Sequence, residues 1–141
     1  MGLIEALQDK DDKKAYALAQ KIIAESAGSD AFYCYLDDFL GLLGHGSSFV
    51  RARGCVLACA QAKWDAHNRL NAAMSKVLCL LHDDKPTVAR QCLAALHEVA
   101  AYKPELRPTI RAEIGKMDLS RYKDSMAPLL EKDRLRLLDI L

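Results

Sequence analysis

Apolar residues recur along the chain with the spacing of α-helices, and short polar or glycine-containing segments separate the periodic stretches. Residues spaced by 0, 3, 4, 7 and 8 positions share one face of a helix. The first clear stripe of this kind consists of Ala15, Leu18, Ala19, Ile22 and Ile23. Asp11 or Asp12 can cap the start of that helix, and Gly28 follows its end.

The same reasoning predicts helices along the rest of the chain. The expected caps or first residues are, in chain order, Ser29 or Asp30, Ser47 or Ser48, Asp65, Pro86, Pro104, Asp118 and Ser125. A long apolar stripe from Leu70 to Leu81 predicts one unbroken helix after Asp65. No segment shows sustained alternation with period 2, so the fold is predicted to be all-α. Because the connections are short, successive helices should be antiparallel.

Gly54 lies inside an otherwise helical run. A glycine in a helix interior costs about 1 kcal/mol relative to alanine. We therefore expect a neighbouring helix to approach this position so closely that a Cβ atom would be blocked.

An internal repeat connects two of the predicted helices. The sequence Arg-Gly-Cys-Val-Leu-Ala from Arg53 matches Arg-Gln-Cys-Leu-Ala-Ala from Arg90, at a spacing of 37 residues. The turns that begin at His45 and His82 share this spacing. Such self-similarity is typical of folds built from stacked repeats.

The segment Asp-Asp-Lys-Pro-Thr-Val-Ala-Arg, from Asp83 to Arg90, resembles the turn and second-helix start of the HEAT-repeat (armadillo-type) family. The resemblance implies a short right-handed α-solenoid of stacked antiparallel hairpins. It also implies that Asp83 or Asp84 and Arg90 tie adjacent elements together, whereas Ser47 stands where the earlier turn would carry its Asp. We expect one HEAT-like domain over residues 1–141, with the clearest repeats at about 30–64 and 66–102 and a terminal cap at about 118–141.

The charge is unevenly distributed although the net charge is only +1. Residues 1–48 carry four basic and eight acidic side chains, and residues 49–141 carry sixteen basic and eleven acidic ones. This asymmetry is compatible with an ordinary mixed surface or with a basic face on the later helices.

No pattern in the sequence indicates catalysis or a cofactor. Nucleotide-binding glycine motifs, nucleophile elbows and zinc-protease motifs do not occur. Cys55 and Cys59 share a helical face, but His67 or His97 would not complete four ligands at zinc-site spacing. All five cysteines lie in predicted helices and are expected to be reduced and buried. We predict a protein that is not an enzyme and binds neither metal nor cofactor.

No apolar run approaches the roughly 20 residues that span a bilayer. The first residues also lack the basic start and long apolar stretch of a secretory signal. The sequence therefore predicts a cytoplasmic protein without a membrane segment.

The leading hypothesis for function is a protein-interaction or scaffold module that presents its helical surface to a protein partner. The alternative is binding of nucleic acid or another polyanion through a basic face of residues 49–123. The candidate binding surface consists of cationic and aromatic side chains: Arg51, Lys63, Trp64, Arg69, His97, Arg107 and Arg111.

Overall fold

The computed structural model describes residues 2–141, so Met1 of the predicted domain lies outside the described residues. Within this range the protein is all-α, without a β-strand. The helices are α1 (Leu3–Leu7), α2 (Asp12–Ser26), α3 (Leu36–Gly41), α4 (Ser48–Cys59), α5 (Arg69–Ala72), α6 (Met74–Leu78), α7 (Pro86–Tyr102), α8 (Arg107–Ile114) and α9 (Ala127–Leu138). Short 3-10 segments join them: η1 (Tyr33–Tyr35), η2 (Leu42–Gly44), η3 (Ala62–Trp64), η4 (Cys79–His82), η5 (Pro104–Leu106) and η6 (Leu119–Arg121).

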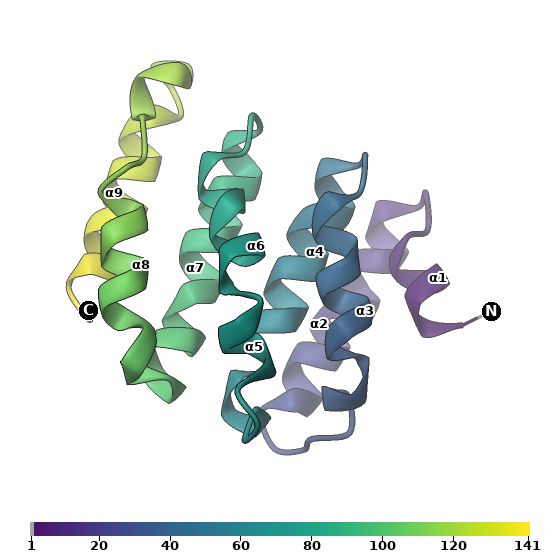
Figure 1. Ribbon diagram of the computed structural model, residues 1–141. Helices are drawn as coiled ribbons and strands as arrows, with labels where there is room; N and C mark the ends of the chain where they lie inside the picture. Colours follow the sequence, from purple (N-terminus) through teal and green to yellow (C-terminus); the bar gives the residue numbers. More distant parts are fainter. Residues whose placement is uncertain (1) are drawn as a thin grey trace.

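The helices lie in two layers (Figure 1). We call α1, α3, α5, α6 and α8 the first-helix layer, and α2, α4, α7 and α9 the second-helix layer. Within the second layer, α2 packs on α4, α4 on α7, and α7 on α9. Each helix thus buries its apolar side against the other layer and against its neighbours in its own layer.

Helix α4 is enclosed on almost every side. Eight of its twelve residues are buried, because α3 and η2 cover it while α2 and α7 flank it. A Cβ atom on Gly54 would lie 2.7 Å from Cβ of Leu42 and 2.8 Å from the carbonyl oxygen of Phe39. Real Cβ atoms are not found so close to such neighbours. The predicted close approach at Gly54 is therefore confirmed.

Several predicted helix starts are confirmed, and two are wrong. The start predicted at Ser29 or Asp30 is one of these, because η1 begins only at Tyr33 and α3 at Leu36. Asp11 caps α2 by accepting hydrogen bonds from the backbone N–H groups of the second and third residues of the helix. Pro86 is the first residue of α7, and Asp118 caps η6. The cap of α9 is Met126 rather than Ser125, and it makes no side-chain capping bond.

The predicted unbroken helix after Asp65 is also wrong. The chain forms α5 and α6 instead, separated at Ala73, whose φ and ψ of −101° and 3° depart from helical values. Asp65 still acts at the start of α5, since its carboxylate accepts from the backbone N–H groups of Arg69 and Leu70. Asn68 precedes α5 in the left-handed conformation, with φ 57°.

The structural repeat is one residue longer than the sequence match. Helix α4 begins at Ser48 and α7 at Pro86, which is a separation of 38 residues. Arg53 and Arg90 are 37 residues apart in the sequence match. Counted from the first residue of its own helix, each therefore differs from the other by one position, which is a rotation of about 100° around the helix axis. This rotation agrees with their partners, because Arg53 pairs backward with Asp12 on α2, and Arg90 pairs forward with Asp133 on α9.

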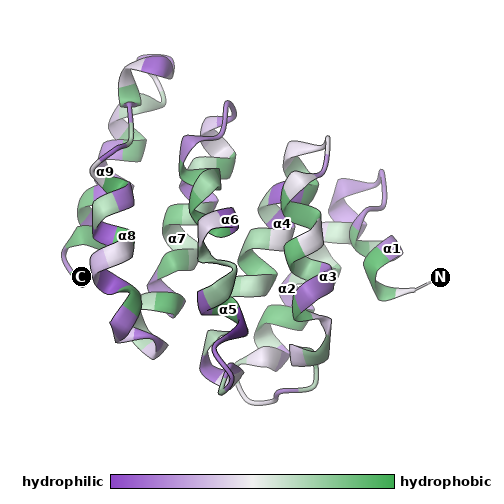
Figure 2. Ribbon diagram, viewed as in Figure 1, coloured by the Kyte–Doolittle hydropathy of each residue, from purple (hydrophilic) through white to green (hydrophobic). Residues whose placement is uncertain are grey.

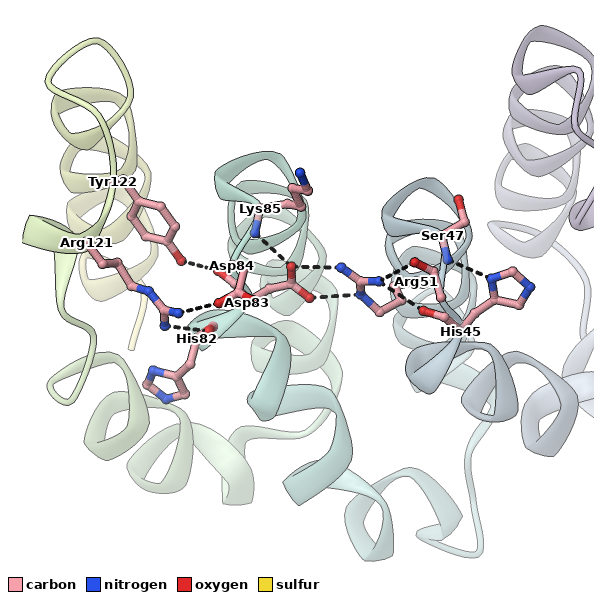
Figure 3. Close-up of polar contacts among 10 residues, drawn as sticks. His45, Ser47, Arg51, His82, Asp83, Asp84, Lys85, Arg121 and Tyr122 are labelled. Carbon is pink, nitrogen blue, oxygen red and sulfur yellow. Dashed lines mark hydrogen bonds and ion pairs between the residues drawn. The ribbon is translucent and has the colours of Figure 1, made fainter.

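A polar network joins the turns between successive pairs of helices (Figure 3). Arg51 on α4 binds Asp83 through Nε to Oδ2 at 2.9 Å and Nη2 to Oδ1 at 3.0 Å. From the other side, Arg121 donates to the carbonyl of His82 and to Asp84, and Tyr122 donates to the carbonyl of Asp83. Asp83 and Asp84 thus tie adjacent elements together through Arg51 and Arg121. Arg90 takes no part in this network.

Polar residues gather at the turns, and apolar positions recur along each helix (Figure 2). Among residues 2–141, no helix combines the length and the apolar character that crossing a membrane requires.

Replacement of Gly54 by alanine should destabilise the fold by about 1–3 kcal/mol, as overpacking of a dense core usually does. The atoms that a new Cβ would meet belong to the α3 backbone and to the base of the Leu42 side chain, which cannot rotate away. Urea unfolding followed by circular dichroism measures the change. Gly41→Ala is the matched control: nothing lies within 4 Å of a Cβ there, so alanine should leave stability equal or higher. Equal midpoints for the two variants would contradict the prediction.

Replacement of Arg51 by methionine should lower the free energy of unfolding by about 1.5–3 kcal/mol, the usual range for hydrogen bonds to a charged group. The variant leaves the Asp83 carboxylate, whose side chain is 8% exposed, without its guanidinium partner. Arg111→Met is the control, because Arg111 is exposed and forms no ion pair within residues 2–141. A change below about 0.5 kcal/mol is expected there, and a similarly small change in Arg51→Met would show that the network adds little.

Candidate functional site

The outer side of the second-helix layer carries four of the surface hollows. The first, of about 310 Å³, lies across α2, α4 and α7 and is lined by Asp12, Lys13, Tyr16, Phe49, Ala52, Arg53 and Gln91. The second, also of about 310 Å³, lies between α7 and α9 and is lined by Thr87, Arg90, Gln91, Ala94 and Asp133. A smaller one, of about 110 Å³, is lined by Ala94, His97, Asp133 and Arg136. The fourth lies nearer the C-terminal end of α2.

The first three hollows adjoin one another. Gln91 lines both the first and the second, while Ala94 and Asp133 line both the second and the third. They therefore form a row of adjoining hollows from α2 across α4 and α7 to α9, which we call the second-helix groove. Its floor includes alanines, whose short side chains leave space between bulkier neighbours.

Two large aromatic side chains border the α2 end of this groove. Tyr16 is 61% exposed and Phe49 is 60% exposed, which makes them the most exposed of the large hydrophobic residues in the described chain. They line the same hollow although they come from different helices. Exposed aromatic residues beside a hollow are typical of protein-binding surfaces.

The charges in the groove are partly neutralised by internal ion pairs. Arg53 Nη2 lies 2.7 Å from Asp12 Oδ1, and Arg90 Nε lies 2.6 Å from Asp133 Oδ2. The side-chain hydrogen bond to Asp133 is the main cause that raises the pKa of Arg90. Both carboxylates of the groove thus have cationic partners.

The fourth hollow, of about 220 Å³, contains the predicted surface residue Lys63 together with Glu98 and Tyr102. The Lys63 ammonium donates to the carbonyl of Ala27 and lies 4.9 Å from the Trp64 ring centre and 5.6 Å from that of Tyr102. Trp64 Nε1 donates to the carbonyl of Ser26 at 2.8 Å. Lys63 and Trp64 therefore fasten the end of α2 to η3 and α7, and Trp64 is only partly exposed.

Arg69 belongs to a different network, beside the buried carboxylate of Asp65. Its side chain pairs with Asp37 on α3 and lies 5.7 Å from the ring centre of Tyr33. The Tyr33 hydroxyl donates to Asp65, and Lys103 Nζ lies 3.1 Å from the same carboxylate. Asp65 and Lys103 are 0% and 4% exposed as side chains, so this is a buried ion pair that joins the start of α5 to the end of α7.

The surroundings of Asp65 determine its ionisation. Burial alone raises the pKa of this carboxyl, but hydrogen bonds from Tyr33, the backbone of Leu70 and Lys103 outweigh burial. The pKa of Asp65 is consequently lower than usual. Burial and the hydrogen bond to Asp65 raise the pKa of Tyr33.

The predicted cationic residues do not form one continuous face. Arg51 is engaged in the turn network, and Arg107 on α8 donates to the carbonyl of Ala100 at 2.9 Å. Arg111 is exposed, but it lies on α8 in the first-helix layer, away from the second-helix groove. Of the seven predicted residues, only His97 lines the groove, at its α9 end.

Three of the five cysteines lie together in the core between α4 and α7. Cys55, Cys59 and Cys92 are fully buried, whereas Cys34 and Cys79 are exposed, so the expectation of buried thiols is wrong for these two. The hydrogen bond to Cys55, together with burial, raises the pKa of Cys59 and of Cys92, which keeps both protonated at neutral pH. Within residues 2–141, no group of three or more His, Cys, Asp or Glu side chains is placed to hold a metal ion.

Several residues that line the groove did not belong to the binding surface predicted from the sequence. Tyr16, Phe49, Gln91 and Arg136 all line it. Tyr16 and Phe49 each lie off the apolar stripe of their own helix, and this is the signal that marks them as outward-facing. That they line one hollow although they come from two helices, however, depends on how α2 packs on α4.

Comparisons of the chain with protein-family models, with curated proteins and with solved structures found no match. The second-helix groove is therefore interpreted from its own geometry and chemistry.

Replacement of Asp65 by asparagine should cost about 3 kcal/mol or more at pH 7, because it leaves the buried Lys103 ammonium without its counter-charge. A carboxyl whose pKa is lower in the folded state stabilises the fold at pH values above its unfolded-state pKa, which is about 4. This stabilisation is lost as the pH falls through the pKa of the folded state. The difference between wild type and variant should therefore shrink below about pH 4. Urea unfolding at pH 7, 5, 4 and 3 measures it. Asp38→Asn is the control, since Asp38 is exposed, and a pH-independent difference for Asp65→Asn would contradict the prediction.

Proposed function

We propose that this chain is a non-catalytic protein-interaction module that binds a protein partner in the second-helix groove. The observation that carries the proposal is a row of adjoining hollows with two exposed aromatic side chains, Tyr16 and Phe49, at one end. Aromatic side chains beside a pocket supply much of the binding energy at protein interfaces. Among the lining residues of the first and second hollows there is no Ser, Cys or His, and both carboxylates, Asp12 and Asp133, are paired with arginines.

We also propose that the architecture is a short right-handed α-solenoid of the HEAT-like kind, formed by one domain. Support comes from the two layers of antiparallel helices and from the turn network that links successive pairs. In stacked pairs of this kind, the second helices lie parallel and form one long surface, which suits extended partners. The cytoplasmic location remains a prediction from the sequence.

The alternative is nucleic-acid binding through the basic residues of 49–123. The observation in its favour is a hollow of about 470 Å³ on the first-helix layer, whose lining includes Arg69 and Lys76. It has less support, because Arg69 already pairs with Asp37, and because Arg51 and Arg107 also have internal partners.

The test compares the wild-type chain with Tyr16→Ala/Phe49→Ala as baits for affinity purification from the source cells, read by quantitative mass spectrometry. Partners bound in the groove should be recovered at least about tenfold less with the double variant, as expected for loss of interface anchors. Leu135→Ala is the matched control, because Leu135 is 54% exposed but lines none of the hollows described above. Recovery of the same proteins with all three baits would refute the groove as the binding surface.

The same preparations separate the two functions. Fluorescence anisotropy with a labelled 20-nucleotide single strand at 50 mM and 200 mM salt should show no salt-steep binding if the protein-interaction proposal holds. The alternative would be favoured if the labelled strand bound tightly, if salt and Lys76→Ala weakened this binding, and if no protein partner depended on the groove.

A further inference from the structure

The second-helix groove has a charge pattern that selects among protein partners. Its lining contains four permanent cations, Lys13, Arg53, Arg90 and Arg136, and two carboxylates, Asp12 and Asp133. Each carboxylate is already bound by an arginine. The charges left for a ligand are therefore both positive, and His97 beside Arg136 adds a further potential donor.

The two remaining cations lie at opposite ends of the groove. Lys13 is an exposed residue on α2, and Arg136 is an exposed residue on α9. Neither forms a side-chain hydrogen bond or ion pair within residues 2–141. An exposed, unpaired cation at each end favours a ligand that carries acidic groups.

The first hollow of the groove favours a ligand that carries an apolar group at one position. Tyr16 and Phe49 border it, and Ala52 is among its lining residues. An apolar side chain inserted there would remove exposed aromatic surface from water, which is favourable in proportion to the area buried. Lys13 lines the same hollow, so an acidic neighbour of that apolar side chain would meet a cation.

The length of the groove suits an extended segment. Helices α2 and α9 are separated by α4 and α7, so three interhelical spacings of about 9 Å give a span of about 27 Å. About eight residues of extended chain cover that distance at roughly 3.4 Å each.

We propose that the second-helix groove binds an acidic peptide segment with one large apolar or aromatic side chain, which is seated between Tyr16 and Phe49 while flanking carboxylates meet Lys13 and Arg136. This inference rests on the proposed function and adds the class of partner. A nucleic acid fits this surface less well, because its evenly spaced phosphates would pass Asp12 and Asp133 and would find only two unpaired cations.

The test selects peptides from a random 12-residue phage-displayed library on the full chain, with bait-free resin as background. The enriched peptides should contain two or more Asp or Glu residues around one Phe, Trp, Leu or Ile. A synthetic fluorescent copy of the most enriched peptide is then titrated by anisotropy. Lys13→Glu/Arg136→Glu should weaken its binding at least about tenfold, and so should Phe49→Ala.

Arg111→Glu/Lys116→Glu is the matched control, since it reverses two exposed charges on α8 and in the turn that directly follows it, and it should change the affinity less than twofold. Circular dichroism verifies that all variants remain folded. An excess of an unlabelled 20-nucleotide strand should not displace the peptide, and displacement with loss of the acidic preference would overturn the inference in favour of a general polyanion site.

The outcomes separate the two proposals. Enriched peptides that are neutral or basic but still require Phe49 would overturn the acidic class and leave the protein-interaction function standing. Acidic peptides that bind equally well to both groove variants would overturn the inference, because their site would lie elsewhere. No enrichment over bait-free resin would count against both.

Discussion

The enclosure of α4 is the constraint on which the rest of this structure depends. This helix contacts α2, α3, η2 and α7, so small side chains and Gly54 are needed where its neighbours come closest. The pair α3–α4 cannot bury its own apolar surface, and its stability comes from the pairs on either side. Because α4 is shared among so many contacts, its packing fixes the positions of α2 and α7, and α9 follows from α7.

The second-helix groove is a consequence of this packing. Two of the side chains that line this groove, Ala52 and Ala94, are short, and larger residues from neighbouring helices stand beside them. The turn network runs along the same succession of helix pairs, since Arg51, Asp83 and Arg121 hold successive turns together. Arg51, which the sequence offered for binding, is used there as an internal tie. The surface left for a partner is therefore aromatic and only moderately basic.

Ionic contacts in this protein mostly connect elements that are distant in sequence. Arg53 reaches back to α2, Arg90 reaches forward to α9, and Lys103 meets Asp65 in the interior. Buried or half-buried pairs of this kind specify which helix lies beside which, because a slipped arrangement would leave a charge unpaired in an apolar environment. The exposed cations Lys13 and Arg136 take no part in these ties, and this distinguishes them as candidates for recognition.

The sequence by itself determined the helical class, most of the helix starts and the close approach at Gly54, because apolar periodicity, capping residues and glycine act through local geometry. It did not determine the break at Ala73, where the backbone leaves helical angles within an otherwise regular stripe. Nor did it determine that Arg51 is an internal tie or that Tyr16 and Phe49 line the same hollow. These features depend on the packing of helices far apart in the chain, and a rotation of one residue, or about 100°, decides which neighbour each side chain faces.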